Sequence, residues 1–329
     1  MSSKHKIYSD FINEFAIRIL IRRKILSTVA LFLSRAACIV APSWLILWII
    51  LELNTLSFCF ILKIKCVRHS SVRVKYFLIQ SITSAMFLFL LHLRESSLNL
   101  QLTCLILGVK AARGPFQEWF IVIVHKISLL PSTLLITWQK IAPIFILMFI
   151  HTIFVWFLIA ASVFIGGFLQ INKNNFKNII AYSSVFNLGW IIISTNISTK
   201  LFFIFTGIYW SAVLLSIKII FSDKLFSIRA IATNSDKTQT ILIMSNLGGI
   251  PPMPGFLSKW LLLKELIINK VNFAAITFLI IRAINLFIYL KIISKVSLKS
   301  SETQLSLKRP KNALLWVVAT SLSLVIASF

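Results

Sequence analysis

The sequence predicts an all-α, polytopic membrane protein. Hydrophobic residues make up 58% of its 329 residues and charged residues only 13%, whereas an average soluble domain is about half apolar and about a quarter charged. The apolar residues gather in runs of about 20 residues, the length that an α-helix needs to cross a bilayer. These runs do not alternate apolar and polar residues as the strands of a membrane β-barrel do. A bundle of membrane-spanning helices is therefore expected.

Composition and spacing also exclude several functions. The formal net charge is +25, but most basic residues lie in short connections between apolar runs, so we expect membrane lipids and no nucleic acid as partners. The four cysteines show no Cys-x-x-Cys spacing, and the five histidines show no metal-ligand spacing with them. No Gly-x-Gly-x-x-Gly or Walker pattern occurs. We therefore expect this chain itself to bind no metal and no nucleotide.

Residues 1–24 form a basic N-terminal extension. Ile7, Phe11, Phe15 and Ile19 recur every four residues, which places them on one face of a helix. This pattern predicts an amphipathic helix that lies at the membrane interface. A transit peptide is the alternative, and its usual shortage of acidic residues disagrees with Asp10 and Glu14.

Eleven apolar spans follow the extension. The fourth span is interrupted at Gly114 and Pro115, and the ninth is interrupted by Pro251, Pro252, Pro254 and Gly255. Proline and glycine at these places should break the helix. The expected spans are about 25–41, 43–62, 74–93, 99–128, 131–149, 150–170, 179–195, 200–221, 240–268, 272–293 and 313–329.

The positions of the two interrupted spans predict an internal repeat. They are five spans apart, so residues 25–149 and 150–295 can form two five-helix repeats, each with one discontinuous helix. An odd number of helices in each repeat inverts the topology of the second. Inverted repeats with broken helices are a recurring transporter design, in which the ion site lies at the breaks. A loop and the eleventh span, 296–329, would follow the repeats.

The distribution of basic residues predicts the orientation. Of the 34 lysines and arginines, 23 fall in the N-terminal extension and the connections after the even-numbered spans, and four in the connections on the other face. Positive connections stay on the side from which a membrane protein is inserted. The N-terminus should therefore lie on the same side of the membrane as these basic connections, and the C-terminus on the opposite side.

Four charged residues inside apolar spans are the candidate functional residues: Glu52, Lys110, Lys140 and Lys259. A charge at the bilayer centre costs about 2.5 to 3.5 kcal/mol on insertion scales. Burial disfavours the charged form of an amine, whereas a neighbouring carboxylate favours it. Moving the carboxylate away therefore lowers the proton affinity of the amine. This is the chemistry of a proton relay. The alternatives are a structural ion pair at Glu52 and lysines that extend to the interface.

Six ordered motifs between about residues 43 and 295 resemble one family, subunit 2 of mitochondrial NADH-ubiquinone oxidoreductase (respiratory complex I). Each motif alone is modest, but the ordered set is specific. The motifs are Trp48-Ile-Ile-Leu-Glu52-Leu-Asn54, Lys75-Tyr-Phe-Leu-Ile-Gln80, Lys110 with Gly114-Pro115-Phe116, Thr137-Trp-Gln-Lys140-Ile-Ala-Pro143, Ile180-Ala-Tyr-Ser-Ser184 with Leu188-Gly-Trp190, and Leu247-Gly-Gly-Ile-Pro-Pro-Met-Pro-Gly-Phe-Leu-Ser-Lys259-Trp260.

The resemblance implies a function and a location. It implies an antiporter-like, proton-translocating subunit of the membrane arm, in the mitochondrial inner membrane, with the N-terminus in the matrix. It assigns Glu52 and Lys110 to a charge pair, Lys140 to the central lysine and Lys259 to the distal lysine. The enzyme would be a proton-translocating NADH:ubiquinone reductase, whose NADH, FMN, iron–sulfur clusters and ubiquinone belong to other subunits. Its partners would be the other membrane-arm subunits, including neighbouring antiporter-like ones.

The chain departs from the family pattern beside the first break. The family's Ala-Pro-Phe-His is replaced by Gly114-Pro115-Phe116-Gln117, and Arg113 replaces a small or apolar residue. A self-sufficient cation/proton exchanger and a membrane scaffold whose charges fix helix packing remain competing hypotheses. The chain contains no soluble energy-transducing domain, which favours the redox-complex subunit.

Overall fold

The structure is a computed structural model that describes residues 25–62, 67–93, 97–150, 152–222, 237–251 and 253–298. The expected amphipathic helix at 1–24, the eleventh span at 313–329 and Pro252 lie outside these residues. The chain forms two compact units, residues 1–106 and 107–329. This division does not test the expected repeat boundary at 149/150, which stays a prediction.

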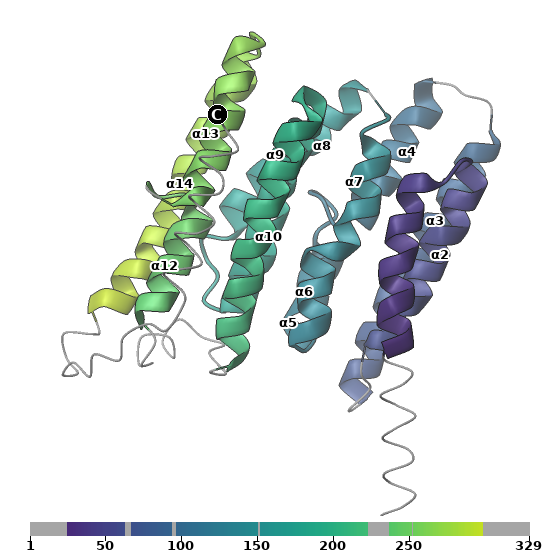
Figure 1. The fold of residues 1–329 in the computed structure, drawn as a ribbon, viewed down its shortest axis with the longest axis horizontal. Helices are drawn as coiled ribbons and strands as arrows, with labels where there is room; N and C mark the ends of the chain where they lie inside the picture. The colour runs from purple at the N-terminus through teal and green to yellow at the C-terminus, as the bar shows by residue number, and fades with distance from the viewer. Residues whose placement is uncertain are drawn as a thin grey trace, which may run out of the picture. The chain divides into compact units, whose positions relative to one another are not determined.

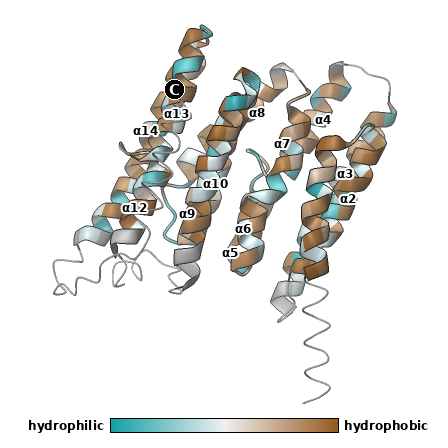
Figure 2. Ribbon diagram, viewed as in Figure 1, coloured by the Kyte–Doolittle hydropathy of each residue, from teal (hydrophilic) through white to brown (hydrophobic). Residues whose placement is uncertain are grey.

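The described residues contain α-helices, one 3-10 helix and no β-strand. Six of the helical segments are long and apolar enough to cross a membrane, and the ribbon coloured by hydropathy shows that apolar residues dominate them (Figure 2). The predicted fold class, an all-α protein with many membrane spans, is therefore confirmed for this part of the chain. The six segments are Trp44–Ile61, Ser70–His92, Leu129–Leu147, Phe176–Ile197, Thr199–Ile217 and Ala274–Lys295.

The first unit is built on an antiparallel helix pair. A helix at Ile25–Val40 is followed by α2 (Trp44–Ile61) and α3 (Val67–His92). The Trp44 and Phe87 rings meet near one end of the α2–α3 pair, and the Phe58 and Tyr76 rings meet near the other, with centroids 4.8 Å apart. Because residues late in α3 contact residues early in α2, the two helices run in opposite directions. α4 (Ser97–Lys110) begins in this unit and ends in the second.

The predicted fourth and fifth spans are divided into short helices. The fourth span consists of α4, which begins in the first unit, and α5 (Glu118–Lys126). The fifth consists of α6 (Leu129–Ile136), the 3-10 helix η1 (Trp138–Lys140) and α7 (Ile141–Leu147). Pro143 explains why α7 begins afresh. It lies in the first turn of α7, where its missing N–H leaves no intrahelical hydrogen bond unmade.

The most deeply buried of the remaining helices of the second unit is α9. These helices are α8 (Ile153–Leu169), α9 (Phe176–Ile197), α10 (Thr199–Ser222), α12 (Lys237–Gly248), α13 (Pro254–Ile268) and α14 (Asn272–Leu298) (Figure 1). Every residue of α9 from Ile179 to Ser194 is buried. α8 and α10 pack against it, and α12, α13 and α14 pack against one another. Polar side chains on α9 therefore face other helices.

Glycine allows α8 and α9 to approach closely. A Cβ added at Gly166 of α8 would lie 2.6 Å from the backbone nitrogen of Phe186, and one added at Gly189 of α9 would lie 2.3 Å from Val163. Neither distance is compatible with a larger side chain, because heavy atoms repel one another strongly at such separations. The contact between these two helices therefore depends on both glycines.

Candidate functional site

In the first unit, Glu52 of α2 is held by hydroxyl groups. Ser84 of α3 donates a hydrogen bond to one carboxylate oxygen, and Thr55, one turn further along α2, donates to the other at 3.3 Å. The Trp48 indole donates to the Ser84 carbonyl at 2.9 Å, which fixes Ser84 beside α2. Hydrogen bonds to an ionised group are stronger than neutral ones, so this arrangement can hold a carboxylate.

The first unit contains a further charged residue inside an apolar helix, Arg35. Its Nε donates to Oδ1 of Asn54 at 3.2 Å, and both side chains are buried. Asn54 also accepts from Ser34, at 3.4 Å. A buried guanidinium needs such acceptors, and the contact anchors the helix Ile25–Val40 to α2.

Lys110 is the last residue of α4 and is buried. The helix ends there, and Ala112 has a positive φ of 58°. Gly114 and Pro115 follow, joined by a cis peptide bond, and α5 begins at Glu118. The structure therefore places Lys110 at the interruption of the predicted fourth span. Because Glu52 and Lys110 lie in different units, their pairing stays a prediction.

Two further residues distinguish this interruption. Arg113 is fully buried, whereas Glu118 is exposed. The Trp119 indole donates to the Val109 carbonyl at 3.2 Å. This bond ties the first turn of α5 to the last turn of α4 across the gap.

Lys140, the last residue of η1, is buried and reaches the middle of α9. Its Nζ donates to the Ser184 hydroxyl at 3.0 Å and to the Ser184 carbonyl at 3.5 Å. The same Nζ lies 4.4 Å from the centroid of the Phe120 ring, a distance at which an aromatic face attracts a cation. Three elements, η1, α9 and α5, therefore meet at this amine.

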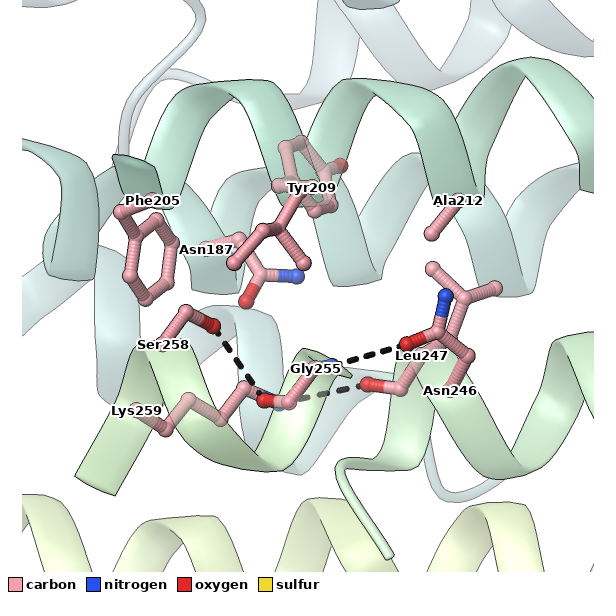
Figure 3. A pocket seen from close by; sticks show the side chains of 10 residues that line it. Asn187, Phe205, Tyr209, Ala212, Asn246, Leu247, Gly255, Ser258 and Lys259 are labelled. Atoms are coloured by element: carbon pink, nitrogen blue, oxygen red, sulfur yellow. Dashed lines mark hydrogen bonds between the residues drawn. The ribbon is translucent and has the colours of Figure 1, made fainter. Parts of the chain in front are cut away.

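Lys259 lies at the second interruption, between α12 and α13. Gly249, directly after α12, has φ +74°, a conformation that glycine adopts without strain. The Asn246 side chain accepts a hydrogen bond from Gly255 N at 2.8 Å and so closes the interruption. Lys259 Nζ donates to the Leu247 carbonyl at 3.2 Å (Figure 3). The free carbonyls at the end of a helix carry partial negative charge, so the end of α12 stabilises a cation.

A second cation reaches the same interruption. Arg282 of α14 is buried, and its Nη2 lies 3.4 Å from the Gly249 carbonyl, to which it donates. Its guanidinium carbon lies 5.0 Å from the centroid of the Phe256 ring. The sequence analysis assigned no role to this arginine, and the structure places it beside Lys259. Pro251 and Pro254 lie in the described part of this interruption.

A small cavity opens beside Lys259. Its volume is about 20 Å³, which is enough for one water molecule. Asn187 of α9 and Tyr209 of α10 face Asn246, Ser258 and Lys259 across it (Figure 3). The cavity can therefore hold a water molecule between the lysine and α9.

Polar residues of α9 link the surroundings of the two lysines. The Tyr209 hydroxyl lies near Ser183, Ser184 and Asn187, without a direct hydrogen bond to any of them. Ser184 is the acceptor of Lys140, and Tyr209 and Asn187 line the cavity beside Lys259. The structure thus brings Lys140 and Lys259 to one polar strip, defined as Ser183, Ser184, Asn187 and Tyr209. Among the residues that the structure describes, no group of three His, Cys, Asp or Glu residues could hold a metal ion.

The chain is similar to several known proteins. Residues 90–285 match the family described as NADH:quinone oxidoreductase/Mrp antiporter, TM. The chain is 30% identical over 318 residues to NADH-ubiquinone oxidoreductase chain 2 of Squalus acanthias, with 87% of this chain and 90% of the relative covered. It is 32% identical over 289 residues to the chain 2 of Xenopus laevis, with 78% and 81% covered.

Two solved structures share the fold. Respiratory complex I from Thermus thermophilus with bound Aureothin contains a chain that aligns with a TM-score of 0.78 at 21% identity, covering 92% of this chain and 77% of that one. The Mrp complex from Dietzia sp. contains one with a TM-score of 0.67 at 15% identity, covering 82% and 59%.

The helical fold and the family match define an antiporter-like membrane subunit. Within this class, the chain belongs to the NADH-ubiquinone oxidoreductase chain 2 family. The family resemblance predicted from the six motifs is confirmed.

Proposed function

We propose that this chain is a proton-translocating core subunit of the membrane arm of respiratory complex I. It lies in the mitochondrial inner membrane with eleven spans, arranged as inverted repeats at 25–149 and 150–295, and with its N-terminus in the matrix. Its partners are the other membrane-arm subunits, including neighbouring antiporter-like ones. Family membership and the basic residues on one set of connections support this proposal.

The observation that carries the proposal is the hydrogen bonding of Lys140 and Lys259. Both side chains are buried, and both amines are held by uncharged oxygen atoms of Ser184 and Leu247. A neutral acceptor can bind either an ammonium or an amine, since both forms have N–H donors. The hydrogen bonds can therefore survive a change of protonation, as a proton relay requires.

The proposed path runs from the first repeat to the second. Glu52 favours the charged form of Lys110 while the two are paired, and separation of the pair releases a proton towards Lys140. Ser184 and Tyr209 carry hydroxyls, which can accept one proton and donate another. Water in the cavity lined by Asn187 and Tyr209 completes the connection to Lys259.

The chemistry that drives this movement takes place elsewhere. The enzyme is a proton-translocating NADH:ubiquinone reductase, and NADH, FMN, the iron–sulfur clusters and ubiquinone are bound by other subunits. In this proposal, the present chain supplies only the proton relay. The free energy reaches it through the membrane arm.

Replacing Lys140 tests the proposal. Lys140→Met keeps an unbranched, apolar side chain and removes the titratable amine. In the assembled complex, NADH-driven proton pumping should fall sharply while the yield of complex is retained. Lys200→Met, at an exposed lysine of α10, should leave pumping unchanged. Normal pumping by Lys140→Met would contradict the proposal, and failed assembly would instead support a structural role for this lysine.

A further inference from the structure

Three buried polar side chains lie outside the polar strip. Gln170 follows the last residue of α8, and Asn285 and Tyr289 lie on α14. Each is at most 1% exposed. Asn285 and Tyr289 are four residues apart and so share one face of α14. α8 and α14 pack against each other, and the Tyr289 hydroxyl of α14 lies near Gln170.

The polar atoms of these side chains need hydrogen-bond partners. Both polar atoms of Gln170, both of Asn285 and the Tyr289 hydroxyl are buried and have no hydrogen-bond partner among the described residues. Leaving such an atom unsatisfied costs about 1–3 kcal/mol. Buried polar atoms that lack a protein partner are typically satisfied by ordered water, which makes about three hydrogen bonds per molecule.

The surroundings of Tyr289 show where such water would lead. The Tyr289 hydroxyl lies near Gln170 and Ser183 but makes no direct hydrogen bond to either. Polar groups that face one another across such a gap are commonly bridged by water. Ser183 belongs to the polar strip, next to the Ser184 hydroxyl that binds Lys140. At the other end, Gln170 is the last buried residue before the turn between α8 and α9, in which Asn172 and Asn174 are exposed.

We infer that Gln170, Asn285 and Tyr289 form a water-binding site that connects the polar strip to the α8–α9 turn. The ligand is water, and the three side chains supply the donors and acceptors that order it. This inference rests on the proposed function. In it, the site supplies Lys140 with protons from the side of the membrane on which the α8–α9 turn lies. The basic residues of the connections predict that this side is the matrix.

Cysteine labelling tests whether water reaches the site. In the assembled complex, Gln170→Cys should react with a small, water-soluble methanethiosulfonate reagent, because this reaction requires a hydrated thiol. Ser162→Cys is the matched control on α8. Ser162 is equally buried, but its hydroxyl donates to Ile159 O at 2.7 Å, so its cysteine should stay unlabelled. Mass spectrometry of the peptides that carry positions 162 and 170 reports both reactions. Equal protection of the two cysteines would overturn the water site.

Proton pumping tests what the water does. Tyr289→Phe removes one hydroxyl and keeps the ring, so it should lower the number of protons pumped per NADH oxidised. Tyr182→Phe removes the hydroxyl of another buried tyrosine and should not change this ratio. An unchanged ratio in Tyr289→Phe would overturn the supply route even if position 170 is labelled. The labelling result does not depend on pumping. Failure of the proposed function, seen as normal pumping by Lys140→Met, is therefore distinguishable from failure of the water site.

Discussion

Lys140 and Lys259 reach their acceptors in different ways. Lys140 extends from η1 to Ser184 on α9, 44 positions further along the chain, whereas Lys259 binds a carbonyl of its own interruption, 12 positions earlier. The Lys140 site therefore depends on how helices pack. The Lys259 site depends on the break between α12 and α13. Both sites use uncharged oxygens, which tolerate either protonation state of the amine.

Removing the Ser184 hydroxyl should weaken the Lys140 site selectively. Hydrogen bonds to charged groups contribute about 1.5–3 kcal/mol, so Ser184→Ala should slow proton pumping by roughly tenfold or more. The control is Ser194→Ala. Ser194 lies on the same helix and is buried, and its hydroxyl donates only within the helix, to Ile191 O at 2.6 Å. Pumping measured in proteoliposomes should be close to normal for this control, and equal losses in the two variants would point to general damage of α9.

The charged residues of the site could be predicted from the sequence, but their neutral partners could not. A lysine or glutamate inside an apolar span is costly, so Glu52, Lys110, Lys140 and Lys259 are conspicuous in the sequence. Serine, asparagine and tyrosine occur in many buried helices without a functional role. Only the packing of α9 with α10 and α13 shows that Ser184, Asn187 and Tyr209 lie between the lysines.

Among the elements, the interruptions depend on residues that the sequence displays. Glycine and proline follow the ends of α4 and α12, and Pro254 begins α13. The 3-10 turn η1 was not predicted as a separate element. Its geometry depends on the following helix, α7, and this places Lys140 at the junction. The close packing of α8 and α9 was also not predicted. Gly166 and Gly189 permit it, but a glycine in a sequence does not show which helix will pack against it.

Gly166 should be intolerant of even one added methyl group. The Cβ of Gly166→Ala would meet the Phe186 backbone nitrogen at 2.6 Å, and such overpacking typically costs about 1–3 kcal/mol. Gly207→Ala of α10 is the matched control, because a Cβ there meets nothing within 4 Å and alanine favours a helix by about 0.5–1 kcal/mol. Thermal stability of the purified complex should fall for Gly166→Ala and be unchanged or higher for Gly207→Ala. The reverse order would show that the α8–α9 contact is loose.

At the scale of the whole molecule, the charge distribution and the helix order determine which connections share a side. The α8–α9 turn and the α13–α14 turn are exposed, and an odd number of expected spans separates them. The two turns should therefore lie on opposite sides of the membrane. This arrangement follows from the basic connections and from the number of spans, and it requires no knowledge of how the two compact units are placed.

Labelling from each side of the membrane tests this topology. Asn174→Cys in the α8–α9 turn should react with a membrane-impermeant thiol reagent from the matrix side only. Asn269→Cys, directly after α13 and equally exposed, should react from the opposite side only. Intact mitoplasts and inverted inner-membrane vesicles provide the two orientations. Labelling of both positions from one side would refute the expected order of spans.

The central claim is that Lys140 and Lys259 belong to one proton path, and a double-variant cycle tests it most directly. Protons pumped per NADH would be measured for Lys140→Met, Lys259→Met and the double variant in proteoliposomes with equal amounts of assembled complex. Residues that act on one path show non-additive effects, so the double variant should lose no more pumping than the more severe single variant. Losses that multiply in the double variant would contradict the claim, because they would show two independent paths.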